Sequence, residues 1–362
     1  MRSRKIWIAL SVLLGVVVLA AAWAGWTAYR VNQDLTAAVD DATVLRQAVE
    51  NGDDGDDVVA RSALTDLQTH SGSAADRTDG LTWSVLEKVP FFGDDAQGVA
   101  VVSGVVDDLS DSGIESLVEV SADLESIVPT NGKVDLAAVE RLQGPVSSAR
   151  ASFAKADDRL SAEDSSGYVE RLRSKYRELA GQVSDASAAM DSADTAIQIL
   201  PAMLGASSSQ NYLLIFQNNA EIRATGGLPG AVSLVHADSG AVSMTRQVAA
   251  NTFGFTDKPV LPLTPAEREI YGDIVGTFFL DANLQPDFPR ASDLWRARWE
   301  QVHPEQIDGV LAIDPVAISY VLGATGPIQV DGVTLTQDNA VDELLHEVYL
   351  RYRDPDLSLI HI

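Results

Sequence analysis

The longest uncharged part of the chain is residues 6–28, where aliphatic side chains follow one another without an interrupting polar face. A helix over these residues would be about 34 Å long, slightly more than the hydrocarbon thickness of a bilayer. Arg2, Arg4 and Lys5 precede the stretch, whereas Arg30 alone follows it closely. Because cytoplasmic flanks carry the excess of basic residues, the pattern predicts a single transmembrane helix with a cytoplasmic N-terminus and an extracytoplasmic remainder.

Aromatic residues mark both ends of this stretch, as they do where a helix meets the two membrane interfaces. They are Trp7 on the N-terminal side and Trp23, Trp26 and Tyr29 on the C-terminal side. A cleaved signal peptide is an alternative, because Ala22-Trp23-Ala24 resembles a small-x-small cleavage site. The apolar run is longer than a typical signal core, so we expect residues 1–30 to remain as a cytoplasmic tip and membrane anchor.

Residues 31–204 carry apolar positions at alternating spacings of three and four, which are typical of packed helices. Three such seams run over residues 35–49, 139–160 and 169–200. Pro145 interrupts the second seam, so we expect a helix to restart there. The seams predict an extracytoplasmic stalk, either a helical bundle or a coiled coil, and copies of the chain could also associate through them as a homo-oligomer.

Three segments interrupt the helical pattern. Residues 51–57 are rich in Asp and Gly and predict an acidic loop, and residues 71–80 predict a second polar break. Residues 83–93 are apolar, and their Pro and Gly predict that one helix ends and another begins there. We expect this last segment to pack the helices together; the alternative is that Phe91-Phe92 touches lipid headgroups.

Beyond residue 205, short apolar runs alternate with helical periods, which predicts a mixed α/β sheet domain over residues 205–356 and an α+β chain as a whole. The expected strands are residues 212–216, 231–236, 241–246, 309–313 and 328–330, and the expected helices are residues 291–301, 316–322 and 338–349. The second and third of these strands flank Asp238-Ser239-Gly240, which predicts a β-hairpin.

Polar side chains directly follow the first of these strands, where α/β sheets commonly bind ligands. The candidate ligand-binding residues are Asn218, Asn219, Glu221, Arg223, Gly226, Gly227 and, further along the chain, Arg246. The glycines permit close backbone approach, and the guanidinium of Arg223, oriented by Glu221, suits a phosphate or a sugar hydroxyl. The alternative is a turn network in which the two Asn side chains satisfy backbone groups and Glu221 pairs with Arg223.

The amino-acid composition excludes several classes of partner and catalytic site. The chain has 52 acidic and 26 basic residues, a net charge of −26, which argues against a nucleic-acid partner. It has no Cys, so disulfides, thiolate metal sites and cysteine nucleophiles are excluded. No zinc-protease, nucleophile-elbow or nucleotide-binding motif is present, so the sequence assigns no catalytic residue and predicts no cofactor.

Oxygen ligands for magnesium could come from Asp281, Asp287 and Asp314. Asp287 and Asp314 lie close to Pro residues, and turn capping explains them equally well. The histidines His70, His236, His303 and His346 have no metal-ligand spacing. We therefore predict no metal site.

Three stretches carry a resemblance: residues 211–230 (NYLLIFQNNAEIRATGGLPG), 283–289 (NLQPDFP) and 308–327 (DGVLAIDPVAISYVLGATGP). Together they resemble the domain-of-unknown-function family 4012 of bacterial envelope proteins, over about residues 200–353. The resemblance implies a single-pass protein with a helical region ahead of the shared domain. More distantly, the order of elements around residues 313–328 is similar to the LytR-CpsA-Psr phosphotransferases, which attach lipid-linked glycans to the cell wall, but their Arg-Asp-Thr motif is not evident.

Taken together, these patterns predict a single-pass cell-membrane protein whose extracytoplasmic domain binds glycan or another component of the cell envelope. Two alternatives stay open: an envelope phosphotransferase that attaches lipid-linked glycan, and a structural spacer that oligomerises through its stalk. Residues 357–362 (LSLIHI) resemble the translated end of a sequencing adaptor, so we expect this tail to be artefactual and the distal domain to be truncated.

Overall fold

The structure is a computed structural model that describes the backbone of residues 2–51, 56–90 and 92–351. It describes side chains over residues 23–49, 58–90, 92–121, 124 and 126–351. Contacts within the chain divide it into two compact units. The helical unit comprises residues 1–128 and 135–201, and the sheet unit comprises residues 129–134 and 202–362.

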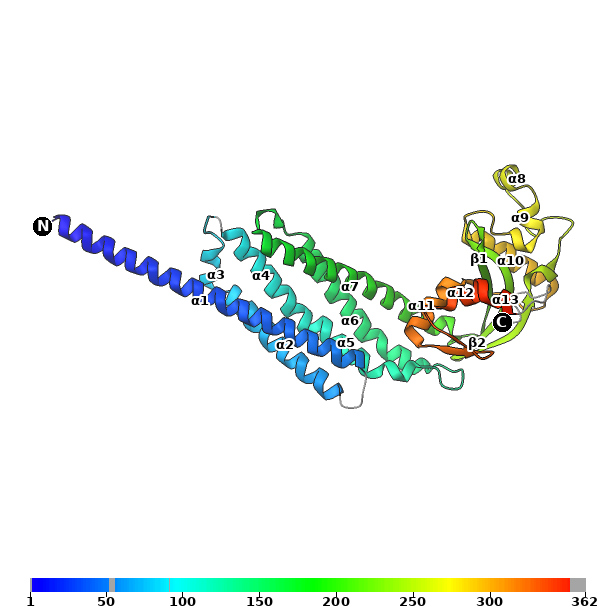
Figure 1. The fold of residues 1–362 in the computed structure, drawn as a ribbon, viewed down its shortest axis with the longest axis horizontal. Coiled ribbons are helices and arrows are strands. Elements are labelled where there is room, and N and C mark those ends of the chain that lie inside the picture. The colour runs from blue at the N-terminus through cyan, green and yellow to red at the C-terminus, as the bar shows by residue number, and fades with distance from the viewer. Residues whose placement is uncertain (1, 52–55, 91, 352–362) are drawn as a thin grey trace. The chain divides into compact units, whose positions relative to one another are not determined.

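Long helices packed side by side make up the helical unit (Figure 1). In chain order they are α1 (Arg2–Asn51), α2 (Asp56–Thr78), the short α3 (Leu81–Leu86), α4 (Gly93–Asp108), α5 (Glu115–Asp123), α6 (Leu136–Ser161) and α7 (Glu170–Met203). A π-helical turn (Leu109–Ile114) joins α4 to α5, and 3₁₀ turns follow α5 (Leu124–Ile127) and precede α7 (Ser165–Gly167). The predicted helical N-terminal region is confirmed.

Two kinds of packing hold these helices together. Small side chains let α1 and α2 approach closely, and those buried between them include Ala38, Ala48, Ala60 and Ala63. Larger side chains fill the space between α4, α6 and α7, among them Phe153, Leu160, Tyr168 and Tyr176. The hydroxyl of Tyr176 donates to the carbonyl of Leu160 at 2.7 Å, so its polar end is satisfied inside this core.

Two predictions for the helical unit are wrong. Helix α6 continues through Pro145, because Leu142 and Val146, buried on either side of it, keep both halves of the helix on one apolar seam. Residues 71–78 belong to α2 and are not a polar break. Ser71 is fully buried, and its hydroxyl lies 2.8 Å from that of Ser110, so small polar side chains serve helix packing here. Residues 52–55 of the predicted acidic loop lie outside the described residues.

The membrane prediction falls largely outside the described side chains. Among the residues whose side chains the structure describes, no helix is long and apolar enough to cross a bilayer. Most of the predicted transmembrane stretch, residues 6–22, has no described side chains, although the backbone of α1 is helical from Arg2 onward.

A mixed four-stranded sheet organises the sheet unit. Its strands, in the spatial order β3–β2–β1–β4, are β1 (Gln210–Arg223), β2 (Gly226–Asp238), β3 (Ala241–Ala249) and β4 (Gly309–Ile313). β2 pairs antiparallel with both β1 and β3, whereas β4 pairs parallel with β1. The predicted mixed sheet is confirmed, as is the hairpin at Asp238-Ser239-Gly240, where Ser239 and Gly240 adopt positive φ angles of 50° and 86°.

Helices and a second small sheet complete this unit. They are α8 (Pro265–Tyr271), α9 (Ile274–Thr277), α10 (Phe288–Val302), α11 (Pro315–Thr325), β5 (Ile328–Val330) paired with β6 (Val333–Leu335), α12 (Ala340–Asp342) and α13 (Val348–Arg351), with 3₁₀ turns at Ala250–Phe253 and Phe279–Asp281 and a π-helical turn at Glu343–Glu347. One face of the sheet packs on α10, where Trp295 and Trp299 are fully buried. The tail at residues 357–362 lies outside the described residues.

A short segment from between α5 and α6 also belongs to the sheet unit. Within residues 129–134, the N–H of Val134 donates to the carbonyl of Gly240, and the N–H of Val242 donates to the carbonyl of Gly132, both at 2.9 Å. Lys133 also forms a β-bridge with Ala241. The sequence pattern contained no signal for this return, because six residues are too few to show a periodicity.

Candidate functional site

The candidate residues lie in the hairpin formed by the end of β1 and the start of β2. The prediction that the first strand ends at Phe216 is wrong, because β1 continues to Arg223. Asn218, Asn219 and Glu221 therefore lie within a strand. Its pairing with β2 shifts register between Phe216 and Gln217, and again between Asn218 and Ile222. The strand is therefore irregular where its polar residues begin, and such irregularities re-aim side chains.

The two candidate glycines allow close packing inside this hairpin. A Cβ atom on Gly226 would lie 2.2 Å from Oε1 of Gln217, and one on Gly227 would lie 2.2 Å from the carbonyl oxygen of Asn218. The N–H of Gly227 donates to Oε1 of Gln217 at 3.5 Å, and its carbonyl accepts from Nδ2 of Asn283 at 2.9 Å. Gln217 and Asn283 are both buried, so the glycines bring two buried amides against one stretch of backbone.

Arg223 pairs with Asp281, its guanidinium Nη2 lying 3.3 Å from Oδ1. The two side chains are 21% and 15% exposed, so the pair lies just below the surface. Glu221 is exposed, and the alternative in which it pairs with Arg223 is wrong. Partial burial and, second, the charge of Glu221 raise the pKa of Tyr349, whose hydroxyl lies 3.5 Å from Nδ2 of Asn218.

Asn219 connects β1 to the end of its parallel neighbour. β4 ends at Ile313, and the next residue, Asp314, caps α11 by accepting from the N–H of Ala317 at 2.7 Å. Nδ2 of Asn219 donates to the other carboxylate oxygen of Asp314 at 3.4 Å. The carboxyl end of β4 therefore lies beside the later part of β1 and a helix N-terminus, close to the position where open α/β sheets commonly bind ligands.

Several buried polar atoms of this region have no hydrogen-bond partner within the protein. Five of them lie in the hairpin or directly against it: Gln217 Nε2, Asn219 Oδ1, Arg223 Nε, Thr225 Oγ1 and Asn283 Oδ1. We call the residues that carry these atoms, Gln217, Asn219, Arg223, Thr225 and Asn283, the hairpin site. Buried polar groups are normally paired, so such a concentration indicates a place that interacts with a polar partner.

The neighbours of each amide fix which of its two ends is unpaired. Oε1 of Gln217 faces the backbone N–H of Gly227, so Nε2 is the free end. Nδ2 of Asn283 faces a carbonyl and Nδ2 of Asn219 faces a carboxylate, so the free end of each is an oxygen. The hairpin site thus offers donors from Gln217 and Arg223, acceptors from two Asn residues, and a hydroxyl that does both.

With this geometry established, comparison with known proteins places the region. Residues 208–349 match the model of a family described as protein of unknown function (DUF4012). The predicted resemblance to the DUF4012 family is confirmed over these residues, and we call residues 208–349 the DUF4012 domain. No curated protein and no solved structure matches the chain, and the more distant similarity to LytR-CpsA-Psr phosphotransferases finds no support in these comparisons.

All five residues of the hairpin site fall inside the DUF4012 match. Sequence reasoning named Asn219 and Arg223 as ligand-binding residues, whereas Asn283 was not among the candidates. Asn283 opens the second stretch of the family resemblance, which was the available signal for it. Its contact with Gly227 joins positions 56 residues apart, and no periodicity in the sequence reports such a contact.

Arg246 lies elsewhere in the DUF4012 domain. It is opposite Leu234, six residues along β2 from Leu228, which amounts to about 20 Å of strand. Its guanidinium contacts Glu305 at 3.1 Å and Nδ1 of His303 at 2.6 Å. Burial and the charge of Arg246 lower the pKa of His303, so the neutral ring accepts this hydrogen bond. The structure therefore does not bring Arg246 to the hairpin site.

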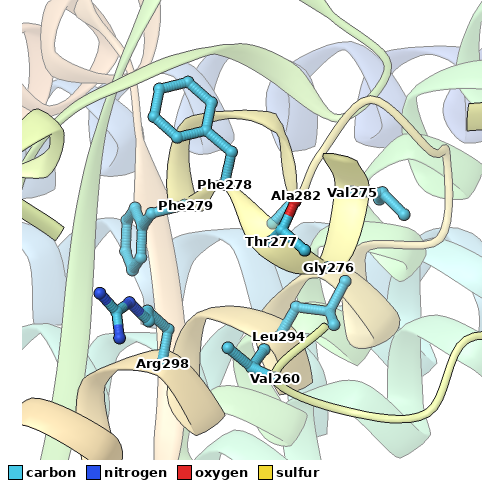
Figure 2. Close-up of a pocket in the computed structure, with 9 residues that line it drawn as sticks. All are labelled: Val260, Val275, Gly276, Thr277, Phe278, Phe279, Ala282, Leu294 and Arg298. Carbon is cyan, nitrogen blue, oxygen red and sulfur yellow. The ribbon is translucent and has the colours of Figure 1, made fainter. Parts of the chain in front are cut away.

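A small cavity lies inside the DUF4012 domain, between the α9 region and α10 (Figure 2). Its volume is about 10 Å³, and its lining includes Val260, Phe279 and Arg298. Space of this size holds about one water molecule. It is too small for an organic ligand.

In the helical unit, a polar cavity of about 240 Å³ is lined by Asp94, Gln97, Glu163, Asp164, Ser166 and Gly167. Glu163 accepts hydrogen bonds from the hydroxyl of Tyr168 at 3.1 Å and from the amide of Gln97 at 3.2 Å. Burial and, next, the charge of Glu163 raise the pKa of Tyr168. These hydrogen bonds connect the start of α4 to the segment that precedes α7.

The three carboxylates considered for magnesium have separate structural roles. Asp281 pairs with Arg223, while Asp287 and Asp314 cap α10 and α11. Among the described side chains, Asp342, His346 and Glu347 place ligand atoms within 4.8 Å of one another. They lie at the surface, where acidic groups commonly gather without a metal, so we assign them no role.

Proposed function

We propose that this chain is a single-pass membrane protein whose DUF4012 domain lies outside the cytoplasm and binds a neutral, hydroxyl-rich ligand, a glycan of the cell envelope, at the hairpin site. The uncharged stretch of residues 6–28 and the basic residues ahead of it support the anchor and its orientation. The DUF4012 match supports the assignment of the binding domain but carries no activity of its own.

The observation that carries the ligand class is the mixture of unpaired donors and acceptors. A fully ionised phosphate only accepts hydrogen bonds, so it cannot satisfy the free oxygens of Asn219 and Asn283. A sugar hydroxyl donates and accepts at once, and several hydroxyls on one ring can serve the whole set. Arg223 is already neutralised by Asp281, which also disfavours an anion.

The two alternatives receive less support. A transferase acting on lipid-linked pyrophosphate needs cationic groups at its site, whereas the guanidinium nearest the hairpin is committed to a carboxylate. A spacer that oligomerises through its seams needs those seams to be free. Leu142, Leu160, Tyr176 and Val183 of the seams are instead buried within one chain.

Titration of the full chain in detergent with a panel of neutral oligosaccharides tests the proposal. Thr225→Val removes the unpaired hydroxyl at nearly constant shape, and we expect about 5–10-fold weaker binding because one hydrogen bond contributes about 1 kcal/mol. Thr325→Val is the matched control, because that hydroxyl bonds to its own helix at Val321 and is exposed. Binding of inorganic pyrophosphate in place of every neutral sugar would overturn the ligand class.

Topology has its own test. Protease added to intact cells should digest the DUF4012 domain while a cytosolic marker survives. Digestion only after the membrane is opened would contradict the proposed orientation without bearing on the ligand.

A further inference from the structure

Helix α3 lies at the end of the helical unit from which the N-terminal part of α1 projects (Figure 1). Large apolar side chains of both helices are exposed there. On α3 and the turn that follows it they are Leu81, Val85, Val89 and Phe92, and on α1 they are Trp23, Trp26 and Tyr29. Leu81 is 90% exposed, Val85 66% and Phe92 64%. Apolar residues gathered in this way on a surface mark a site of interaction.

The fold holds these side chains outward. Trp83, in the middle of α3, is buried against Val31 and Ala74, and its ring N–H donates to the carbonyl of Ala96 at 2.8 Å. The turn after α3 closes tightly, since a Cβ atom on Gly93 would lie 2.3 Å from the carbonyl oxygen of Glu87. With Trp83 fixed inward, Leu81 and Val85 on the other side of this short helix face away from the core.

Contacts place α3 beside the aromatic part of α1. The ring N–H of Trp23 donates to the hydroxyl of Thr82 at 3.3 Å, and Trp83 packs on Val31. Trp23 and Val31 are separated by about 12 Å along the helix axis, and the other two exposed rings of α1 lie between them. Tryptophan and tyrosine concentrate where a helix leaves the hydrocarbon core and enters the headgroup region.

We propose that α3 and the turn through Phe92 form a membrane-contacting surface, with Leu81, Val85 and Phe92 inserted among the lipid headgroups and upper acyl chains of the bilayer that α1 crosses. The inference rests on the membrane anchor proposed above. Lipid is the expected partner because the surface on α3 adjoins the aromatic rings of α1, and these rings lie at the end of the uncharged stretch of α1. Glu87 and Lys88 stand side by side in the turn, so the contact needs no anionic lipid.

This surface gives the helical unit a second attachment to the membrane. A single helix leaves the unit free to tilt and rotate about the point where it emerges. Insertion of three further side chains on a neighbouring element restricts both motions. The orientation of the helical unit against the bilayer is then set by α3 together with α1.

The absence of Cys from the chain makes the test direct. Leu81→Cys, Phe92→Cys, Val39→Cys and Val16→Cys are each labelled with an environment-sensitive fluorophore, and the full chain is reconstituted into phosphatidylcholine vesicles with or without lipid that carries a nitroxide quencher. Val39 is the matched control, since it is 65% exposed on α1 and about 24 Å along the helix from Trp23. Val16 reports on the anchor itself.

Quenching at positions 81 and 92 should be several times that at position 39, and high salt should leave it unchanged. Strong quenching at position 16 with positions 81 and 92 no more quenched than position 39 overturns the membrane-contacting surface and leaves the anchor standing. Loss of quenching at position 16 overturns the anchor and this inference together. Positions 81 and 92 shielded from aqueous iodide but not reached by the lipid quencher would indicate that a second copy of the chain covers them, which also overturns the proposal.

Discussion

The two units of this protein differ in whether their buried polar groups have hydrogen-bond partners. In the helical unit, buried hydroxyl and ring N–H groups find partners: Ser71 bonds with Ser110, Tyr176 with Leu160 and Trp83 with Ala96. In the sheet unit, several buried polar atoms have no hydrogen-bond partner within the protein. Every buried side-chain polar atom that lacks a partner, among the side chains that the structure describes, lies in the sheet unit.

This difference agrees with the proposal that the sheet unit binds a ligand and that the helical unit supports it. Helices packed through Ala and Ser side chains form a body in which each polar atom is satisfied locally, within its own helix or across one contact. The sheet unit has a core of large aromatic residues, and five of the ten unpaired buried polar atoms among its described side chains lie at one end of β1 or directly against it. Because an unpaired buried group costs about 1–3 kcal/mol, such a concentration in one place is more readily explained by binding than by stability.

The largest effect should come from the aromatic core of the sheet unit. Trp295→Ala removes a fully buried ring whose N–H donates to the carbonyl of Phe279 at 2.9 Å. The cavity and the lost hydrogen bond should lower the free energy of unfolding of the sheet by about 3–5 kcal/mol. Hydrogen exchange of the β1 and β2 amides measures this local stability without requiring the whole chain to unfold in one step.

Tyr320→Ala is the control for this change, because Tyr320 is an aromatic residue of the same unit with 69% of its surface exposed. We expect it to alter exchange by less than about 0.5 kcal/mol. If the α2 and α6 amides lost as much protection as β1 on replacement of Trp295, the division into two units would be contradicted.

A smaller effect, dependent on pH, should come from Glu267. Hydrogen bonds from Arg290, the nearer at 2.7 Å, lower the pKa of this carboxyl to about 2 despite its burial. Because the folded pKa lies below the unfolded one, the ion pair stabilises the sheet unit at pH above about 4.5 and is lost as the pH falls toward 2. Glu267→Gln should therefore cost about 2–3 kcal/mol at pH 7.

Acid titration of unfolding checks the sign of this effect. The difference between the parent chain and Glu267→Gln should shrink as the pH falls from about 4.5 and vanish only below about 2, the folded pKa. Glu269→Gln, an exposed position on the same helix, should follow the parent chain throughout. A difference that grew with falling pH would contradict the assignment.

Local pattern predicted much of the fold. Apolar runs gave β4 and the start of β1, and the turn sequence at Asp238-Ser239-Gly240 gave the hairpin, because each depends on neighbours in the sequence. Pattern failed where tertiary contacts decide the outcome. Pro145 does not end α6, because packing on both sides outweighs one missing backbone donor, and Ser71 is polar yet fully buried because it meets Ser110 across a helix contact.

The candidate site was predictable only in part, for the same reason. Asn219 and Arg223 were found because they follow an apolar run, which is a local signal. Their partners Asp314 and Asp281 come from segments about 60 to 95 residues away. The sequence suggested them as metal ligands, and Asp314 also as a turn cap, but did not connect them with Asn219 and Arg223. The extension of β1 to Arg223 was missed because a run of polar residues lacks the alternation by which strands are recognised.

The smallest effects test the comparison itself, through a pair of substitutions that each delete one hydroxyl. Ser71→Ala removes a paired hydroxyl from the helical unit and should lower the stability of α2 by about 1 kcal/mol. Thr225→Val removes an unpaired hydroxyl from the hairpin site and replaces it with a methyl group, so stability in the absence of ligand should stay the same or rise slightly. Hydrogen exchange of the α2 amides in Ser71→Ala and of the β1 amides in Thr225→Val measures the two stability changes. We expect a loss of stability in the first variant and no loss in the second. If Thr225→Val were as costly as Ser71→Ala, its hydroxyl would have a partner in the unliganded protein, and the hairpin site would lose one of the five unpaired atoms on which the proposed ligand depends.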